Sequence, residues 1–325
     1  DKLLADIVIN PNKVGDDYDN KSICGAYVLW QVLYYYSVKY RDSFLQDQIY
    51  RLRVFAGIGT ISDGMNVLYE NRKLIKDSIS ILNMLIKDEN EGNFEFLHSF
   101  DEEDLAEDVD FKDSLLYDDL HSTLLSEIKS NSVSDIYKMS FDGLSSLLTV
   151  LKDNGKIQNE VDEMTVGFYI APMFNSIRRL DFNMSIAINA FYGSSKNIRV
   201  LACNKLFDAN ETRKDMVKEA MEELLNREQK YAPYIYFSNA SSGVLGLLAT
   251  KLLNLTGLPN LVITKKRDKG YGYKGSGRSD SWYDFLTELR GMNYFAQGHE
   301  NAFGVGFTDE KEIKSCYTFL KNDIE

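Results

Sequence analysis

The stretch YIYFSNASSGVLGLLATKLLNLTGLPNLVITK, residues 234–265, decides the fold of the C-terminal part of the chain. Its first five residues, YIYFS, form a short apolar and aromatic run that predicts a strand. SGVLGLLATKLLNLTG follows with apolar residues at helical spacing and ends on a glycine, which is typical of a helix stop. LPNLVITK predicts a second strand, so the three segments together predict a βαβ unit.

The residues after this unit extend the same small domain. A basic, glycine-rich loop is expected at 265–279, followed by a helix at 281–292. A turn and a strand are expected at 298–308, and a closing helix at 309–322. The sequence therefore predicts a second, smaller α/β domain over residues 229–325.

The N-terminal part predicts its own alternation of strands and helices. The predicted strands are ADIVIN (5–10) and the apolar run 52–63, and the predicted helices are 23–40 and 71–87. Such an alternation is typical of an α/β layer with a parallel sheet. Asp63 is then expected at the carboxyl end of a strand, the edge where open α/β sheets bind ligands.

Two further regions lie between these parts, which divides the chain into residues 1–87, 88–135, 136–228 and 229–325. Residues 88–135 are intensely acidic, which is typical of a solvated insertion, although a surface that docks a partner protein or mimics DNA fits the same charge. Residues 136–228 predict helices. The last of these, over 210–231, is expected to be long and exposed and to bridge two domains.

The composition limits the class of protein. A chain of 325 residues with 44% apolar and 26% charged residues is long enough for two soluble domains. No apolar run reaches the roughly 18 to 20 residues that span a bilayer. Cys24, Cys203 and Cys316 lie far apart, which argues against a disulfide framework or a thiolate metal site and favours a reducing, cytoplasmic compartment. The net charge of −12 argues against a nonspecific nucleic-acid coat but permits a local basic groove.

The basic loop is the first candidate site. Glycines between Lys265 and Ser279 would let backbone amides form a concave anion nest, and Arg278 adds a planar fork that matches two phosphate oxygens. Tyr271 and Tyr273 carry rings on which nucleic-acid bases can stack. The alternative interpretation is a flexible basic turn after a strand.

His299 and Asp63 are single-residue candidates. His299 is bracketed by Gly298 and two later glycines, which favours close backbone packing around the ring, while a purely structural histidine is the alternative. Asp63 offers one carboxylate, whereas a hard divalent metal needs several oxygen or imidazole ligands.

Seven segments, in order along the chain, resemble motifs of the DHH phosphoesterases, and most closely those of the RecJ single-stranded-DNA exonucleases. The segments are YDNKSICGAYVLWQVL (18–33), AGIGTISDGMNVLYENRKLI (56–75), GFYIAPMFNSIRRL (167–180), LFDANETRK (206–214), SSGVLGLLATKL (241–252), KGSGRS (274–279) and GHENAFGVGF (298–307). The resemblance covers nearly the whole chain except the acidic insertion. It implies the C-terminal part of a parallel-sheet DHH domain at 1–87, a helical connector at 136–228 and a DHH-associated substrate-binding domain at 229–325.

The resemblance also implies roles for individual residues. Asp63 matches an aspartate that helps to hold a catalytic Mn²⁺ or Mg²⁺, and Gly298 and His299 match a turn that faces the scissile phosphate, where His299 would act in catalysis. Asn175 and Arg179 match residues that line the cleft between the two domains. The loop that grips a DNA phosphate is matched by Lys274, Gly275, Ser276, Gly277, Arg278 and Ser279.

The chain departs from the family pattern at several positions. Gln297 and Arg178 replace glycines, Ser241 replaces a histidine, and Met173 replaces an arginine. The D-x-D-G and D-H-H motifs, which supply most metal ligands in the family, are expected before residue 1. We therefore expect this chain to hold the substrate-gripping half of an active site and to be inactive alone, because one aspartate cannot position two cations.

The resemblance implies a metal-dependent exonuclease that degrades single-stranded DNA in the 5′-to-3′ direction. One alternative is a phosphodiesterase of the same superfamily that acts on short oligonucleotides or cyclic dinucleotides. The other is a non-catalytic nucleic-acid-binding or scaffold protein. The segment 167–180 and the long connector favour the exonuclease, because the small phosphodiesterases use shorter linkers, whereas the acidic insertion favours the scaffold.

Overall fold

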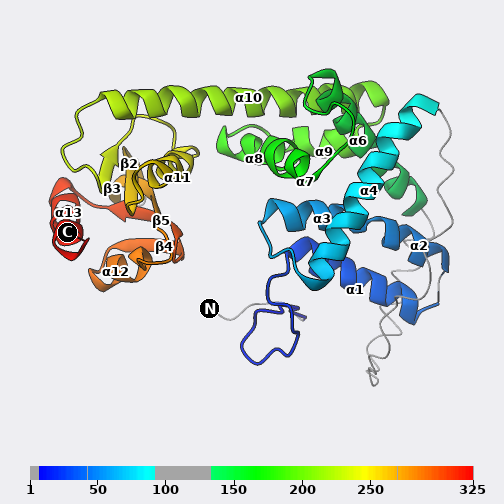
Figure 1. Ribbon diagram of the computed structural model, residues 1–325, viewed down its shortest axis with the longest axis horizontal. Helices are drawn as coiled ribbons and strands as arrows, with labels where there is room; N and C mark the ends of the chain where they lie inside the picture. Colours follow the sequence, from blue (N-terminus) through cyan, green and yellow to red (C-terminus); the bar gives the residue numbers. More distant parts are fainter. Residues whose placement is uncertain (1–6, 42, 92–132, 269, 325) are drawn as a thin grey trace. The chain divides into compact units, whose positions relative to one another are not determined.

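The computed structural model describes residues 7–41, 43–91, 133–268 and 270–324 (Figure 1). These residues form two compact units, each with its own buried apolar core. Unit 1 comprises Asp1–Met173 and Ser185–Lys205, and unit 2 comprises Phe174–Met184 and Leu206–Glu325, as far as they are described. The four-part division expected from the sequence stays a prediction.

Unit 1 is helical throughout its described residues. Its elements are α1 (Gly25–Lys39), α2 (Ser43–Arg51), α3 (Arg53–Ser62), α4 (Tyr69–Glu91), α6 (Val133–Asp153), α7 (Glu163–Thr165), η2 (Val166–Ile170), α9 (Ser185–Tyr192) and the first residues of α8 (Ala171–Arg179) and α10 (Lys196–Asn226). The helices predicted at 23–40 and 71–87 are confirmed as α1 and α4.

The parallel sheet predicted for the N-terminal part is wrong, because the described residues of this part contain no strand. Residues 7–10 have no regular structure, and the apolar run 52–63 forms α3. The buried positions of α3 recur at helical rather than alternating spacing. A side chain at Gly57 would collide with Ser78 of α4, so the glycine allows the two helices to pack closely. The run has the apolar composition of a buried strand, but its buried residues form the packed face of a helix.

The acidic insertion predicted at 88–135 lies almost entirely outside the described residues. At its ends, α4 extends to Glu91 and α6 begins at Val133. Among the helices that the structure describes, none combines the length and the apolar character that crossing a bilayer requires.

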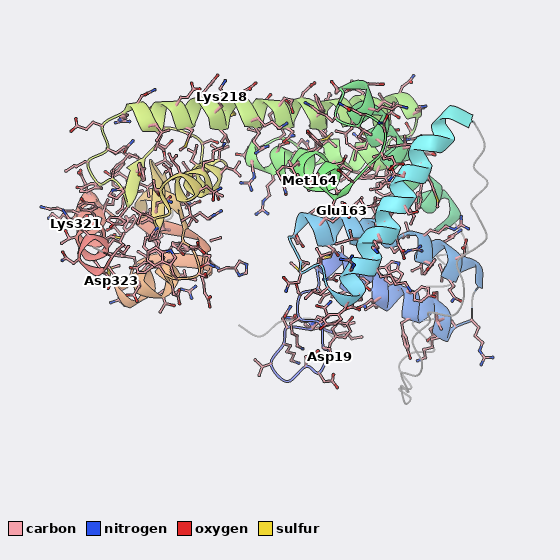
Figure 2. All side chains as sticks on the ribbon, in the orientation of Figure 1. Asp19, Glu163, Met164, Lys218, Lys321 and Asp323 are labelled. Atoms are coloured by element: carbon pink, nitrogen blue, oxygen red, sulfur yellow. The ribbon has the colours of Figure 1, made fainter. Side chains whose placement is uncertain are left out.

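The long helix predicted near residue 210 is confirmed as the second half of α10, which has 31 residues. Charged side chains such as Lys218 are exposed on it (Figure 2). One face of this half is buried, however, because Val217 and Leu224 pack with α11 (Leu245–Thr256). The helix is therefore exposed on its charged face and buried on its apolar face, since apolar residues seven positions apart lie on the same side.

A five-stranded sheet forms the centre of unit 2. Its strands are β1 (Ile235–Phe237), β2 (Asn260–Asp268), β3 (Tyr271–Arg278), β4 (Phe295–His299) and β5 (Ala302–Phe307). They lie in the order β1-β2-β3-β5-β4. Strands β1 and β2 are parallel and are joined by α11, so the predicted βαβ unit is confirmed, and the remaining pairs are antiparallel. Gly257, with φ of +69°, ends α11 as expected.

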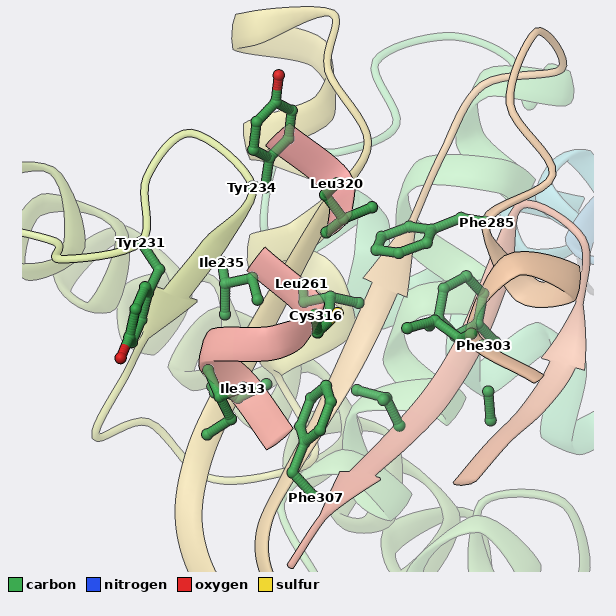
Figure 3. Packing of buried hydrophobic residues seen from close by; sticks show 14 of the residues in the cluster. Tyr231, Tyr234, Ile235, Leu261, Phe285, Phe303, Phe307, Ile313, Cys316 and Leu320 are labelled. Carbon is green, nitrogen blue, oxygen red and sulfur yellow. The ribbon is translucent and has the colours of Figure 1, made fainter. Parts of the chain in front are cut away.

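The two faces of this sheet are covered by different helices. On one face, Val262 of β2 packs with residues of α11 and α10. On the other face, α12 (Phe285–Gly291) and α13 (Glu310–Ile324) cover Leu261, Ile263, Phe303 and Phe307, as Figure 3 shows for the labelled members of this cluster. The sheet therefore lies between two layers of helices.

The predicted basic glycine loop is a strand. Residues 271–278 form β3, which pairs with β2 and β5, so neither a phosphate-binding nest nor a flexible turn is found there. A Cβ atom at Gly275 would lie 2.5 Å from the carbonyl oxygen of Val262, and one at Gly277 would collide with the ring of Phe303. Both glycines are thus needed for packing within the sheet, although glycine is normally typical of turns.

Candidate nucleic-acid interface

Arg278 is the C-terminal residue of β3 and lies against α11. Its Nε donates a hydrogen bond to Thr250 Oγ1 (3.1 Å), and its Nη1 donates to the carbonyl oxygen of Gly277 (2.7 Å). Thr250 Oγ1 donates in turn to the carbonyl oxygen of Gly246 (2.9 Å). Within the described part of the chain Nη2 makes no hydrogen bond, so the guanidinium is fixed along one edge and keeps donors for a ligand.

Gly246 makes room for this guanidinium in the first turn of α11. A Cβ atom on Gly246 would lie 2.9 Å from Arg278 Nη2 and 3.6 Å from Ser276 Oγ. Arg278 therefore reaches the N-terminal end of the helix, where free backbone N–H groups and the helix dipole favour anions.

Arg179, the last residue of α8, reaches the same end of α11. Its Nη1 donates to the carbonyl oxygen of Gly243 (3.0 Å), which directly precedes the N-cap residue Val244. A side chain at Gly243 would collide with the carbonyl oxygen of Arg179. Asn175, four residues earlier on α8, is exposed and shares the helix face of Arg179.

Arg213 on α10 is a third arginine, which the sequence reasoning did not select as a site residue. Its Nε and Nη2 donate to Asn210 Oδ1 (3.2 and 2.9 Å), and Asn210 is only 1% exposed. The available signal was the N-x-x-R spacing within LFDANETRK, because residues three apart on a helix are neighbours.

Arg179, Arg213 and Arg278, here named the three-arginine cluster, influence one another electrostatically. Burial lowers the pKa of Arg278, and the positive charge of Arg179 lowers it further. Burial and then Arg179 likewise lower the pKa of Arg213. The pKa of Arg179 is lowered by burial and by Arg178. Arg179 is thus the common neighbour of the other two guanidinium groups.

Within the described residues, every hydrogen bond that the three-arginine cluster donates is accepted by a neutral oxygen of a carbonyl, amide or hydroxyl group. Glu211 raises the pKa of Arg213, but its carboxylate forms its ion pair with Lys214 (2.6 Å). None of the three guanidinium groups forms an ion pair with another described residue. Half-buried positive charges without a carboxylate are an arrangement that a phosphate would neutralise.

The register of the sheet places other predicted residues beside Arg278. Residues directly opposite one another in antiparallel strands have side chains on the same face. Across β3, β5 and β4 the opposed rows are Arg278–Ala302–His299, Ser276–Gly304–Gln297 and Lys274–Gly306–Phe295. These rows, named here the α11 face, bring together Lys274, Ser276, Arg278 and His299, while Gly275 and Gly277 belong to the opposite face.

Two residues at the end of the strands hold the turn that carries His299. Gly298 has φ of +151°, and a Cβ atom on it would lie 2.5 Å from the carbonyl oxygen of Ala302, so only glycine fits. Ser279 is 3% exposed, and its Oγ donates to the carbonyl oxygen of Glu300 (3.3 Å). His299 itself is exposed. Gly298 and Ser279 therefore fix the conformation of the turn that carries His299.

Asp63 lies in unit 1 as the C-cap of α3, and its backbone N–H donates to the carbonyl oxygen of Gly59 (2.9 Å). The expected position at the end of a strand is wrong, because the preceding run is helical. Within the described residues no group of three His, Cys, Asp or Glu side chains could hold a metal ion. Asp63 by itself is at most one ligand, whereas a hard divalent cation takes about six, so the described residues do not form a complete metal site.

The segment after Asp63 instead fixes a loop before α1. Glu70 accepts hydrogen bonds from Tyr18 Oη (2.9 Å) and Asn20 Nδ2 (2.7 Å), and Asn71 Nδ2 donates to the carbonyl oxygen of Ser22 (2.6 Å). Burial raises the pKa of Tyr18 to about 12. These contacts, some 50 residues apart along the chain, were not predicted from the sequence.

No protein-family model matches the chain. The single-stranded-DNA-specific exonuclease RecJ of Bacillus subtilis (strain 168) is 25% identical over 167 residues, which cover 49% of this chain and 21% of that protein. RecJ of Thermus thermophilus in complex with Mn²⁺ matches with a TM-score of 0.54 at 18% identity, over 84% of this chain and 33% of that one.

Two further solved structures are similar. The same Thermus thermophilus protein in complex with Mg²⁺ matches with a TM-score of 0.54 at 18% identity, over 84% of this chain and 34% of that one. An exonuclease RecJ bound to manganese matches with a TM-score of 0.52 at 18% identity, over 83% of this chain and 54% of that one.

The chain therefore spans about a fifth of the curated relative and a third to about half of the solved structures. At this identity the structural likeness concerns the fold alone, and the fold is mixed α/β, mostly helical, and similar to part of RecJ. Over about half of its length, the chain is a distant homologue of the RecJ exonuclease.

Proposed function

We propose that this chain binds single-stranded DNA through the three-arginine cluster, as the substrate-holding part of a RecJ-like exonuclease. The observation that carries the proposal is the arrangement of Arg179, Arg213 and Arg278, three half-buried guanidinium groups whose hydrogen bonds go to neutral oxygens. Mutual repulsion in a half-buried site is unfavourable, and a bound phosphate removes it.

The chemistry of a phosphate fits the groups around Arg278. Its Nη2 has N–H donors to spare, Ser276 Oγ lies on the same face of the sheet, and the first turn of α11 adds backbone N–H groups. Lys274 and His299 lie on the same face of the sheet as Arg278. They would contact neighbouring phosphates of the bound DNA, and we assign His299 to the scissile phosphate. Asn175 would contact a neighbouring phosphate or sugar.

The relationship to RecJ supports a DNA substrate and a nuclease as the parent activity. Degradation in the 5′-to-3′ direction, by hydrolysis with Mn²⁺ or Mg²⁺, is part of the proposal. We propose Asp63 as one metal ligand of that activity. The described residues do not form a complete metal site, so we assign no hydrolytic step to them.

The test is fluorescence anisotropy of a labelled single-stranded oligonucleotide titrated with the protein. Arg278→Ala is expected to lower the affinity between about 10-fold and about 150-fold, because it truncates charge-assisted hydrogen bonds. Arg227→Ala, which removes an exposed arginine of the same unit, is the matched control and should leave the affinity nearly unchanged. Equal losses in both variants, or tight binding by Arg278→Ala, would contradict the proposal.

A second arm separates binding from catalysis. Mn²⁺ is added, and the length of an end-labelled strand is followed with time. We expect binding without shortening, and EDTA should leave the affinity unchanged, because arginine and phosphate need no metal. Shortening that Asp63→Ala abolishes would instead show that Asp63 works within a complete metal site.

A further inference from the structure

A pair of aromatic rings lies on the α11 face. The ring centroids of Tyr271 and Phe295 are 5.3 Å apart, with an angle of 38° between the ring planes. Phe295 is 46% exposed, and Tyr271 is partly exposed. Other aromatic residues of the sheet, such as Phe303 and Phe307, are buried in the core instead. The exposed pair is therefore distinct from the core and presents apolar area to solvent.

The register fixes the pair relative to Arg278. Phe295 belongs to the row of Lys274 and Gly306, whereas Arg278 belongs to the row two steps along the same face. Four residues of strand separate the two rows, or about 13 Å at 3.3 Å per residue. About four nucleotides span this distance at the spacing of about 3.4 Å per nucleotide that one strand of duplex DNA has.

On β5, the central strand of this surface, the positions that face α11 at the two aligned steps next to Ala302 are glycines, Gly304 and Gly306, while Ser276 and Gln297 flank Gly304 on the neighbouring strands. A Cβ atom on Gly304 would have its nearest neighbour at 3.8 Å, so the protein itself has room for a side chain there. A Cβ atom on Gly306 would lie 3.0 Å from the ring of Tyr271, which shows that this ring lies directly on the backbone. Gly304 thus leaves the backbone of β5 open between the two rows, and Gly306 leaves room for the ring of Tyr271.

We propose that Tyr271 and Phe295 form a platform on which a base of the bound strand stacks while Arg278 holds a phosphate of the same strand. The inference rests on the proposed function and extends it from the phosphates to the bases. The bases of a single strand are free to stack, and aromatic rings bind them with little sequence preference. The site therefore selects single strands over duplexes, whose bases are already stacked.

This assignment changes the one made from the sequence. The sequence offers both Tyr271 and Tyr273 as rings on which bases can stack, but Tyr273 packs with the core of unit 2, its ring 6.0 Å from that of Phe237. Phe295 takes its place beside Tyr271. Phe295 lies 24 positions further along the chain than Tyr271, and only the pairing of β3, β5 and β4 brings the two together.

The test measures the affinity of Phe295→Ala, Phe295→Leu and Phe295→Trp for a labelled oligothymidylate and for an abasic strand of equal length. Phe295→Ala and Phe295→Leu should bind oligothymidylate between about 5-fold and about 150-fold more weakly, since stacking on one base is lost. Phe295→Trp should bind it as the wild type does. All three should bind the abasic strand like the wild type, with unchanged thermal melting by circular dichroism.

The results separate this inference from the proposed function. If Phe295→Ala binds oligothymidylate like the wild type while Arg278→Ala binds weakly, the platform is rejected and the proposed function stands. An equal loss on the abasic strand would likewise reject stacking, because it would indicate a structural effect. Absence of oligothymidylate binding by the wild type would reject both.

Discussion

The hydroxyl group of Thr250 connects Arg278 to the first turn of α11. It accepts a hydrogen bond from Arg278 Nε (3.1 Å) and donates one to the carbonyl oxygen of Gly246 (2.9 Å). A residue that no motif marks as functional thereby fixes the direction of the guanidinium that we propose as the phosphate ligand.

Thr250→Val, which replaces the hydroxyl by a methyl group, is expected to lower the affinity for a single-stranded oligonucleotide between about 2-fold and about 13-fold, because one hydrogen bond contributes about 0.5–1.5 kcal/mol. Thr250→Ser keeps the hydroxyl and should bind like the wild type. In the Arg278→Ala background the Thr250→Val change should have no further effect. Additive losses would contradict the positioning function.

Gly246→Ala is expected to separate stability from binding. Alanine favours a helix over glycine by about 1 kcal/mol, so the melting temperature should stay the same or rise. The new methyl group would lie 2.9 Å from Arg278 Nη2 and displace it, so oligonucleotide affinity should fall. Gly291→Ala, at the end of α12 with no atom within 4 Å of the new Cβ, is the control and should bind normally. If Gly246→Ala binds the oligonucleotide like the wild type, Arg278 Nη2 has no role in binding it.

Arg213→Ala should weaken the salt dependence of binding. In a plot of the logarithm of the affinity against that of the salt concentration, the slope for single strands changes by about 0.7 for each phosphate that the protein no longer neutralises. Arg213→Lys keeps the charge but loses the two hydrogen bonds to Asn210, so its slope should be near that of the wild type at lower affinity. A wild-type slope in Arg213→Ala would show that Arg213 does not bind a phosphate.

Tyr18 is expected to make stability depend on alkaline pH. Burial raises its pKa to about 12, above the ordinary value of 10.0. Between these values the unfolded chain loses the proton while the folded protein retains it, so stability is complete below pH 10 and falls as the pH rises through 12. The difference in melting temperature between the wild type and Tyr18→Phe should therefore shrink across this window. A difference in melting temperature that stays constant with pH would contradict the raised pKa of Tyr18.

The sequence predicted unit 2 better than unit 1. The βαβ unit of residues 234–265 combines clear periodicity with a glycine stop, and both signals act locally. The strand predicted at 52–63 is instead helix α3. Its Gly57 packs closely against Ser78, a residue distant in sequence, and such a contact is not visible in the local pattern. The glycines of β3 likewise indicate a loop in the local sequence. In the structure they avoid collisions with Val262 and Phe303, and these partners cannot be identified from the local sequence.

The candidate site shows the same division. Arg278, Arg179 and His299 carry side chains whose chemistry is visible in a motif. Thr250 and Phe295 are ordinary residues of a helix and a strand, and their proposed roles depend on the register of β3, β5 and β4 and on the packing of α11. Neither the register nor the packing can be obtained from the spacing of residues along the chain.

Alternation of side chains along β3 limits how this segment can change in length. Inserting or deleting one residue between Tyr273 and Arg278 would turn the guanidinium from the α11 face towards the buried core, where a charge is strongly unfavourable. A change of two residues would restore the face but move Arg278 along the strand by about 6.6 Å, away from Thr250. Unless a β-bulge absorbs it, a single-residue insertion or deletion here is thus expected to separate Arg278 from Thr250, whatever residue is added or removed.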